Sequence, residues 1–209
     1  MVNIRILAEG GGERGMPRRG LDTEMRQAFK TFIKKSGIPE ERFRVMACGS
    51  RDQAFKMFQS ALNKENPNEY PLLLVDSEDP VLPNDGAWTH LKKRDGWNRP
   101  RKATDNQAHL MTQCMESWFL ADVNSLVCFF GDGFKINGLP STTSIDAVPK
   151  TDVLDKLEKA SDGSKKGKYH KGNHSCEILG RIDPKLVQNK SPWASKLFKT
   201  MNDLVNQNL

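Results

Sequence analysis

The stretch IRILAEGGGE, residues 4–13, joins a short apolar run to an acid, three glycines and a second acid. Another apolar run, PLLLVDSED at residues 71–79, also ends in clustered acids, Asp76 and Glu78 among them. Unbroken apolar runs of this length are typical of strands buried on both faces of a parallel sheet. Because the carboxyl ends of parallel strands share one edge of a sheet, we expect the two acidic clusters to meet there.

Strand and helix patterns alternate through the first part of the chain. Apolar runs predict strands at residues 3–8, 42–47 and 71–75, and the segments between them carry apolar residues at helical spacing. Asp22 and Ser50 are predicted as the N-caps of these two helices. A strand–helix–strand–helix–strand order implies right-handed crossovers, and it therefore predicts an α/β fold with a mainly parallel sheet flanked by helices.

The middle of the chain is less regular. It is rich in proline, glycine, tryptophan and basic residues, with a short helix expected near residues 88–93. We predict a fourth strand over residues 109–116, followed by a helix that ends at Gly131.

The C-terminal part is predicted to be mainly helical. Thr151, Asp183 and Ser191 have the residue types of N-caps, and a proline follows each of the last two at the first helical position. We therefore divide the chain into an α/β core at residues 1–130 and a helical extension at residues 131–209 that packs on the core.

The bulk composition fits one ordinary globular chain. Of 209 residues, 37% are hydrophobic and 28% are charged, and the formal net charge of +6 is compatible with nucleic-acid binding. No run approaches the roughly 20 apolar residues that span a bilayer, and no secretory signal is visible. Four widely spaced cysteines are read as free thiols. These features predict a cytoplasmic protein without membrane contact.

The acids at the two strand ends are candidate metal ligands. Mg²⁺ prefers a few carboxylates and leaves its other positions to water and substrate phosphate oxygens. Glu9, Asp76 and Glu78 would supply those ligands, because residues two apart in an extended segment face the same side. Solvated acids at strand ends are the alternative. A phosphate-binding P-loop is disfavoured because the glycines lack the Gly-Lys-Ser/Thr ending.

These motifs carry a resemblance to a known family. Glu9-Gly10 with Glu13 after a first strand, and Asp76 with Glu78 after a third, resemble the Toprim domain of topoisomerases, primases and overcoming-lysogenization-defect nucleases. Closer still, an uncharacterised bacterial family of Toprim-like proteins is similar over nearly the whole chain, and four stretches carry this similarity: CGSR at 48–51, LVDSE at 74–78, HLMTQCME at 109–116 and YHKG at 169–172. The resemblance implies a Toprim-like fold, with Glu9 as metal ligand or general acid/base and Asp76 and Glu78 as ligands of Mg²⁺ or Mn²⁺. The usual motif has an aspartate where this chain has Glu78.

Further residues are assigned around this centre. Glu13 or His109 is expected to help transfer protons. The predicted contacts to substrate phosphate are Arg51, Lys168, His170, Lys171 and His174. A zinc site at the two loop histidines and Cys176 is disfavoured, because three ligands without a partner pair make a poor structural zinc site. A second basic cluster between residues 92 and 102, interleaved with Trp88 and Trp97, is expected either to hold nucleic acid by stacking a base or to be a solvated loop with inward-packed tryptophans.

The combined expectation is a Mg²⁺- or Mn²⁺-dependent nuclease, or related phosphodiester-processing enzyme, on DNA or RNA. The resemblance implies an effector subunit of a bacterial anti-phage defence system, working with a separate ATPase, and it leaves a homo-oligomer open. One alternative is a noncatalytic nucleic-acid-binding or scaffold subunit of an ATPase-containing complex. Another is a small-molecule phosphohydrolase or nucleotidyl transferase on the same metal site.

Overall fold

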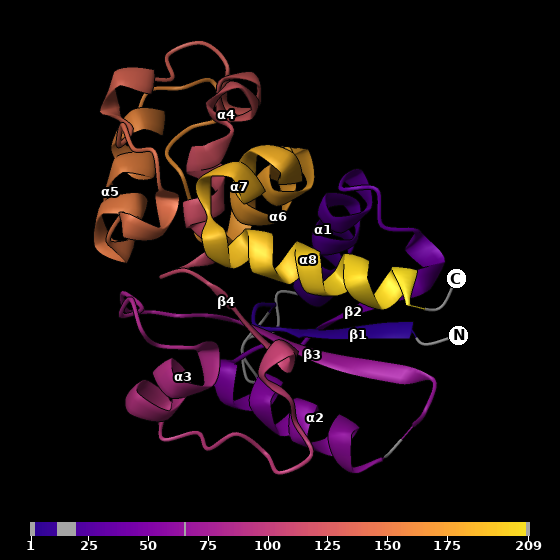
Figure 1. Cartoon of the computed structure of the whole chain (residues 1–209). Helices are drawn as coiled ribbons and strands as arrows, with labels where there is room; N and C mark the ends of the chain where they lie inside the picture. The colour runs from indigo at the N-terminus through magenta and orange to yellow at the C-terminus, as the bar shows by residue number, and fades with distance from the viewer. Residues whose placement is uncertain (1–2, 12–19, 65, 208–209) are drawn as a thin grey trace.

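A four-stranded, all-parallel sheet forms the centre of the molecule (Figure 1). The computed structural model describes residues 3–11, 20–64 and 66–207. The sheet order is β2-β1-β3-β4, and the strands are β1 (Asn3–Ala8), β2 (Phe43–Ala47), β3 (Glu69–Asp76) and β4 (Ala108–Met111). The predicted α/β fold with a parallel sheet is therefore confirmed.

Helices cover both faces of the sheet. Figure 1 shows α2 (Arg51–Asn63) and α3 (Ala87–Asp95) on one side, and α1 (Leu21–Lys35) on the other. Side chains alternate between the two faces, so Leu72 and Leu74 of β3 join one hydrophobic core while the intervening Leu73 joins the other. This explains why the strand reads as an unbroken apolar run.

The C-terminal helices lie on the same side of the sheet as α1. They are α4 (Val123–Phe130), α5 (Lys150–Ser161), α6 (Lys171–Arg181), α7 (Pro184–Lys190) and α8 (Pro192–Asn206). Their apolar faces share one core with the strands. Trp118 stacks on Phe32 of α1 at 5.3 Å between ring centroids, and Phe32 meets Phe198 of α8 at 5.7 Å. The helical extension is present as predicted, whereas the division at residue 130 stays a prediction.

The fourth strand is shorter than predicted. β4 ends at Met111, and a 3-10 helix occupies Met115–Ala121 instead of the end of a strand over 109–116. The chain turns at Gln113, whose φ of 56° lies in the left-handed region. The Met115 N–H then donates to the Asp76 carboxylate at 2.8 Å, and this fixes the new direction.

Helix caps agree with the sequence in three of five cases. Ser50, Asp183 and Ser191 each accept a backbone N–H of the first helical turn. Asp22 is wrong as a cap, because α1 starts after Gly20, whose φ of 103° suits glycine. Thr151 is also wrong as a cap, because Pro149 already sets the extended backbone from which α5 starts at Lys150.

The structure bears on two predictions from the composition, one about the cysteines and one about membrane-spanning segments. All four cysteines are free thiols. Within the described residues, every helix is too short or too polar to cross a bilayer.

The core makes a first testable prediction. Trp118 is only 1% exposed and lies between Phe29 and Phe32, at ring-centroid distances of 6.5 and 5.3 Å. Replacing it in Trp118→Ala should lower the free energy of unfolding by about 3–5 kcal/mol, because the packing is lost and a cavity is left. Urea denaturation followed by circular dichroism measures this change.

Leu82→Ala is the control, because Leu82 is 57% exposed and its truncation should change stability by less than about 0.5 kcal/mol. An equal decrease in the free energy of unfolding in both variants would contradict a core that is packed around the Trp118 side chain.

Candidate metal centre

Glu9, Asp76 and Glu78 converge at the carboxyl edge of the sheet. Glu9 follows β1 and Asp76 ends β3, and these neighbouring strands stay in register up to the pair Ala8–Leu74. The Glu9 N–H donates to the Leu74 carbonyl at 2.8 Å, so the ladder of hydrogen bonds reaches the acid itself. One ligand oxygen from each carboxylate lies within 4.8 Å of the other two.

This set of oxygens fits Mg²⁺ or Mn²⁺. Mg²⁺ binds oxygen at about 2.1 Å in octahedral geometry, so two ligand oxygens lie about 3 Å apart when adjacent and about 4.2 Å apart when opposite. Separations of up to 4.8 Å need only small side-chain rotations to reach these values. Carboxylate oxygens are also suitable ligands for Mn²⁺. The chemistry of the site therefore matches the group that the sequence predicts.

Asp76 is the most deeply buried of the three carboxylates, with 4% of its surface exposed. Its Oδ1 accepts the Met115 N–H at 2.8 Å. Burial raises the pKa of Asp76 well above its usual range, and the nearby carboxylates of Glu9 and Glu116 raise it further. The described residues place no ion-pair partner on this carboxylate, so a bound metal ion would supply the positive charge that stabilises its ionised form.

Glu9 is held by two donors on one oxygen. Its Oε2 accepts the Asp76 N–H at 3.1 Å and the Arg51 Nη1–H at 3.2 Å. Burial nevertheless raises the pKa of Glu9, because desolvation outweighs the lowering effects of Arg51 and of the Asp76 N–H. These contacts fix the side chain through Oε2, and Glu9 lines the cleft.

Glu78 lies in an unusual turn. Its φ is 65° and that of Gln113 is 56°, both in the left-handed region, and the Glu78 N–H donates to the Gln113 carbonyl at 2.9 Å. Such residues cost about 1–3 kcal/mol each and persist where the surroundings hold them. Lys150 holds both, since its Nζ lies 2.6 Å from the Glu78 carboxylate and its N–H donates to Gln113 Oε1 at 2.9 Å.

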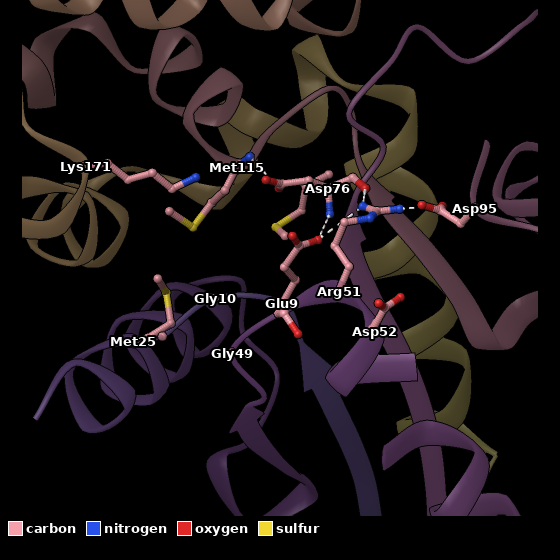
Figure 2. Close-up of a pocket in the computed structure, with 13 residues that line it drawn as sticks. Glu9, Gly10, Met25, Gly49, Arg51, Asp52, Asp76, Asp95, Met115 and Lys171 are labelled. Atoms are coloured by element: carbon pink, nitrogen blue, oxygen red, sulfur yellow. Dashed lines mark hydrogen bonds and ion pairs between the residues drawn. The ribbon is translucent and has the colours of Figure 1, made fainter. Parts of the chain in front are cut away.

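A cleft of about 520 Å³ is lined by Glu9 and Asp76, whereas Glu78 lies outside its lining. Figure 2 shows Asp76 and Glu9 in its middle, with Arg51 on one side and Lys171 on the other. Gly10 belongs to its wall, and its φ of 116° requires glycine. The cleft therefore offers a phosphate-bearing ligand two cations beside the acidic centre.

A buried polar network supports Lys171. Glu116 is fully buried and accepts the Tyr169 hydroxyl at 3.1 Å, while Lys171 Nζ lies 3.2 Å from its carboxylate. Burial alone would lower the pKa of Lys171, but the charges of Glu116 and Asp76 raise it above its usual value. The sequence marked Glu116 only as part of a motif and missed Lys150 altogether, because nothing local connects Lys150 to an acid 72 residues earlier.

Of the predicted phosphate contacts, Arg51 and Lys171 line the cleft, whereas Lys168, His170 and His174 do not. Lys168 pairs with Glu158 at 2.6 Å. His174 packs its ring against two phenylalanines and accepts the His170 N–H on Nδ1 at 3.2 Å. The structure therefore places Lys171 of the YHKG stretch at the cleft and leaves Lys168, His170 and His174 outside it.

The tryptophans of the second basic cluster pack inward. Trp97 stacks on Phe55 at 4.3 Å, and Trp88 lies 5.8 Å from Phe58. They are 8% and 7% exposed, so they have no free face on which a nucleic-acid base could stack. The solvated-loop alternative for this segment is the one that the structure supports.

Of the two predicted proton-transfer residues, His109 and Glu13, the structure describes only His109. Glu13 lies outside the described residues. His109 is fully buried, and its Nε2 lies 3.0 Å from the Asn106 carbonyl, at the amino end of β4. Asp76 pairs instead with Met111, at the opposite end of that strand. His109 therefore has a structural environment away from the carboxylates.

Comparison with known proteins gives a family and no named relative. A family model with the description "Domain of unknown function (DUF4276)" matches residues 8–202. No curated protein and no solved structure matches the chain. The matched range starts at the last residue of β1 and includes β2, β3, β4, the three carboxylates and most of the C-terminal helices, so the family's unit contains the carboxylate centre described above.

The burial of His109 makes a pH-dependent prediction. Burial lowers the pKa of His109 to about 4, so the folded protein resists a proton that the unfolded chain takes up near its ordinary value of about 6.5. Stability should therefore fall as the pH drops from about 6.5 to 4, by up to about 3 kcal/mol from this residue. His109→Gln should flatten this part of the curve in urea unfolding measured between pH 4 and 7.

His170→Gln provides the control, because the His170 side chain is exposed and should leave the acid slope unchanged. An unchanged slope in His109→Gln would show that the imidazole is not the group that resists protonation.

Proposed function

This chain belongs to the DUF4276 family, and we propose that it is a Mg²⁺- or Mn²⁺-dependent enzyme that cleaves phosphodiester bonds in nucleic acid. The observation that carries the proposal is the convergence of Glu9, Asp76 and Glu78 within 4.8 Å at the carboxyl edge of the sheet. Ligand sites of parallel α/β sheets form at this edge. The Toprim resemblance of the same residues supports the same chemistry.

The residues of the centre have distinct roles in this proposal. Glu9, Asp76 and Glu78 would hold the ion, which when bound polarises a phosphate and lowers the pKa of a water ligand. Lys171 and Arg51 line the cleft on either side and would bind phosphate oxygens. Glu9 keeps Oε1 clear of its two donors and would coordinate the ion through that oxygen, while Arg51 and the Asp76 N–H orient the side chain through Oε2.

Nucleic acid is favoured as the substrate for two reasons. The net charge of +6 favours polyanions, and the cleft combines acidic metal ligands with flanking cations. A role beside a separate ATPase in anti-phage defence follows from the Toprim resemblance. It forms part of the proposal, together with the cytoplasmic location that the composition predicts. A noncatalytic scaffold that keeps the same fold is the competing proposal, and cleavage decides between them.

The experiment is a cleavage assay with the purified full chain on single-stranded DNA, duplex DNA, transfer RNA and free nucleotides, with and without Mg²⁺ or Mn²⁺. We expect metal-dependent cleavage of a polynucleotide. Asp76→Asn keeps an oxygen for the Met115 N–H but removes the charge, and it should lower the rate at least about 100-fold. Glu9→Gln should have a similar effect.

Glu40→Gln is the matched control, since Glu40 forms ion pairs with Lys30 and Lys34 away from the cleft. It should cleave at the wild-type rate. Equal activity of Asp76→Asn and the wild type would contradict the assignment, and hydrolysis of free nucleotides alone would favour a small-molecule phosphohydrolase. Binding of nucleic acid without turnover under every metal condition would favour the scaffold.

A further inference from the structure

We propose that the guanidinium of Arg51 stands in the place of a second cation, so that the centre binds one divalent metal ion per chain. The inference rests on the proposed metal-dependent function and deepens it.

Arg51 is fixed on three sides. Its Nη1 donates to Glu9 Oε2 at 3.2 Å and also to the backbone carbonyl of Asp76, and its Nη2 donates to Asp95 Oδ2 at 2.7 Å. The guanidinium carbon lies 5.3 Å from the centre of the Trp97 ring, a cation–π distance. The side chain is only 14% exposed, so the charge is held in one place (Figure 2).

The oxygens that Arg51 holds are those that a second metal ion would need. Paired metal ions lie about 3.5–4 Å apart and share or adjoin their ligands. Beside the cluster of Glu9, Asp76 and Glu78, two more acids line the cleft: Asp95, which Arg51 already binds, and Asp52, whose side chain is exposed at the start of α2. A second ion would therefore have to displace a guanidinium that keeps its charge at every relevant pH.

The charge balance favours one ion. Glu9, Asp76, Glu78 and Asp95 carry four negative charges when ionised. Arg51, Lys150 and Arg94 pair with three of these acids and bring three positive charges. The remainder is one negative charge. One divalent ion changes this remainder to one positive charge, which a bound phosphodiester neutralises. Two ions would give three positive charges in a partly buried site, and a phosphodiester would neutralise only one of them.

The arrangement gives Arg51 a defined role. It orients Glu9 through Oε2 while its charge stays at the side of the cleft opposite Lys171. A substrate phosphate then meets the metal ion on one side and a fixed guanidinium on the other. Arg51 is thus a positioning residue for Glu9 as well as a predicted phosphate contact.

The test is to count bound Mn²⁺ per chain by electron paramagnetic resonance titration of the full chain. We expect one ion in the wild type and in Arg51→Lys, which keeps the charge. Arg51→Met removes the charge and frees Glu9 Oε2, the Asp76 carbonyl and Asp95, so two ions are expected. Arg51→Gln is the second neutral variant if Arg51→Met fails to fold. Arg99→Met, which removes an exposed pair with Asp105, should bind one ion.

Two ions in the wild type, or one ion in every folded neutral variant of Arg51, would overturn the inference while leaving the proposed function intact. No bound ion in the wild type would overturn the proposed function itself. The count therefore separates the two failures.

Discussion

The structure depends on keeping three carboxylates close together at the edge of a buried sheet. β1 and β3 are neighbours in register, so Glu9 and Asp76 cannot move apart without breaking the ladder between them. Burial raises the pKa of both groups, and neighbouring carboxylates raise it further, Glu78 for Glu9 and Glu9 and Glu116 for Asp76. A hard divalent ion is the partner that such a set of oxygens accommodates best. The site is therefore defined by the affinity of these carboxylates for a cation and not by the positive net charge of the whole chain.

The C-terminal helices belong to this site as much as the sheet does. Lys150, at the start of α5, holds Glu78 and the turn at Gln113. Lys171, at the start of α6, lines the cleft and rests on the buried Glu116. Both helices share the core of the strands through their apolar faces. The extension therefore adds Lys150 and Lys171 to Arg51 of α2 around the carboxylates, and the family match over residues 8–202 includes all three cations.

Local patterns in the sequence were enough for the sheet and for the acids, but not for their surroundings. The apolar runs located the first three strands, and parallel topology then placed Glu9 beside Asp76 and Glu78. The end of β4 could not be read, because the turn at Gln113 depends on a hydrogen bond between Met115 and an acid 39 residues earlier. Likewise, an alternating pattern does not say at which end of a strand His109 finds its partner. Contacts between distant segments, such as Lys150 with Glu78, leave no local signal.

The central claim is that a metal ion binds between Glu9, Asp76 and Glu78. Diffraction from crystals soaked in Mn²⁺, recorded where manganese scatters anomalously, tests it most directly. We predict an anomalous peak about 2.1–2.2 Å from one oxygen of each of the three carboxylates. The claim would be contradicted by a map that shows no anomalous peak in a solvent-accessible cleft while Glu9 stays paired with Arg51 and Glu78 with Lys150. In that case the carboxylates would be balanced by the protein's own cations alone.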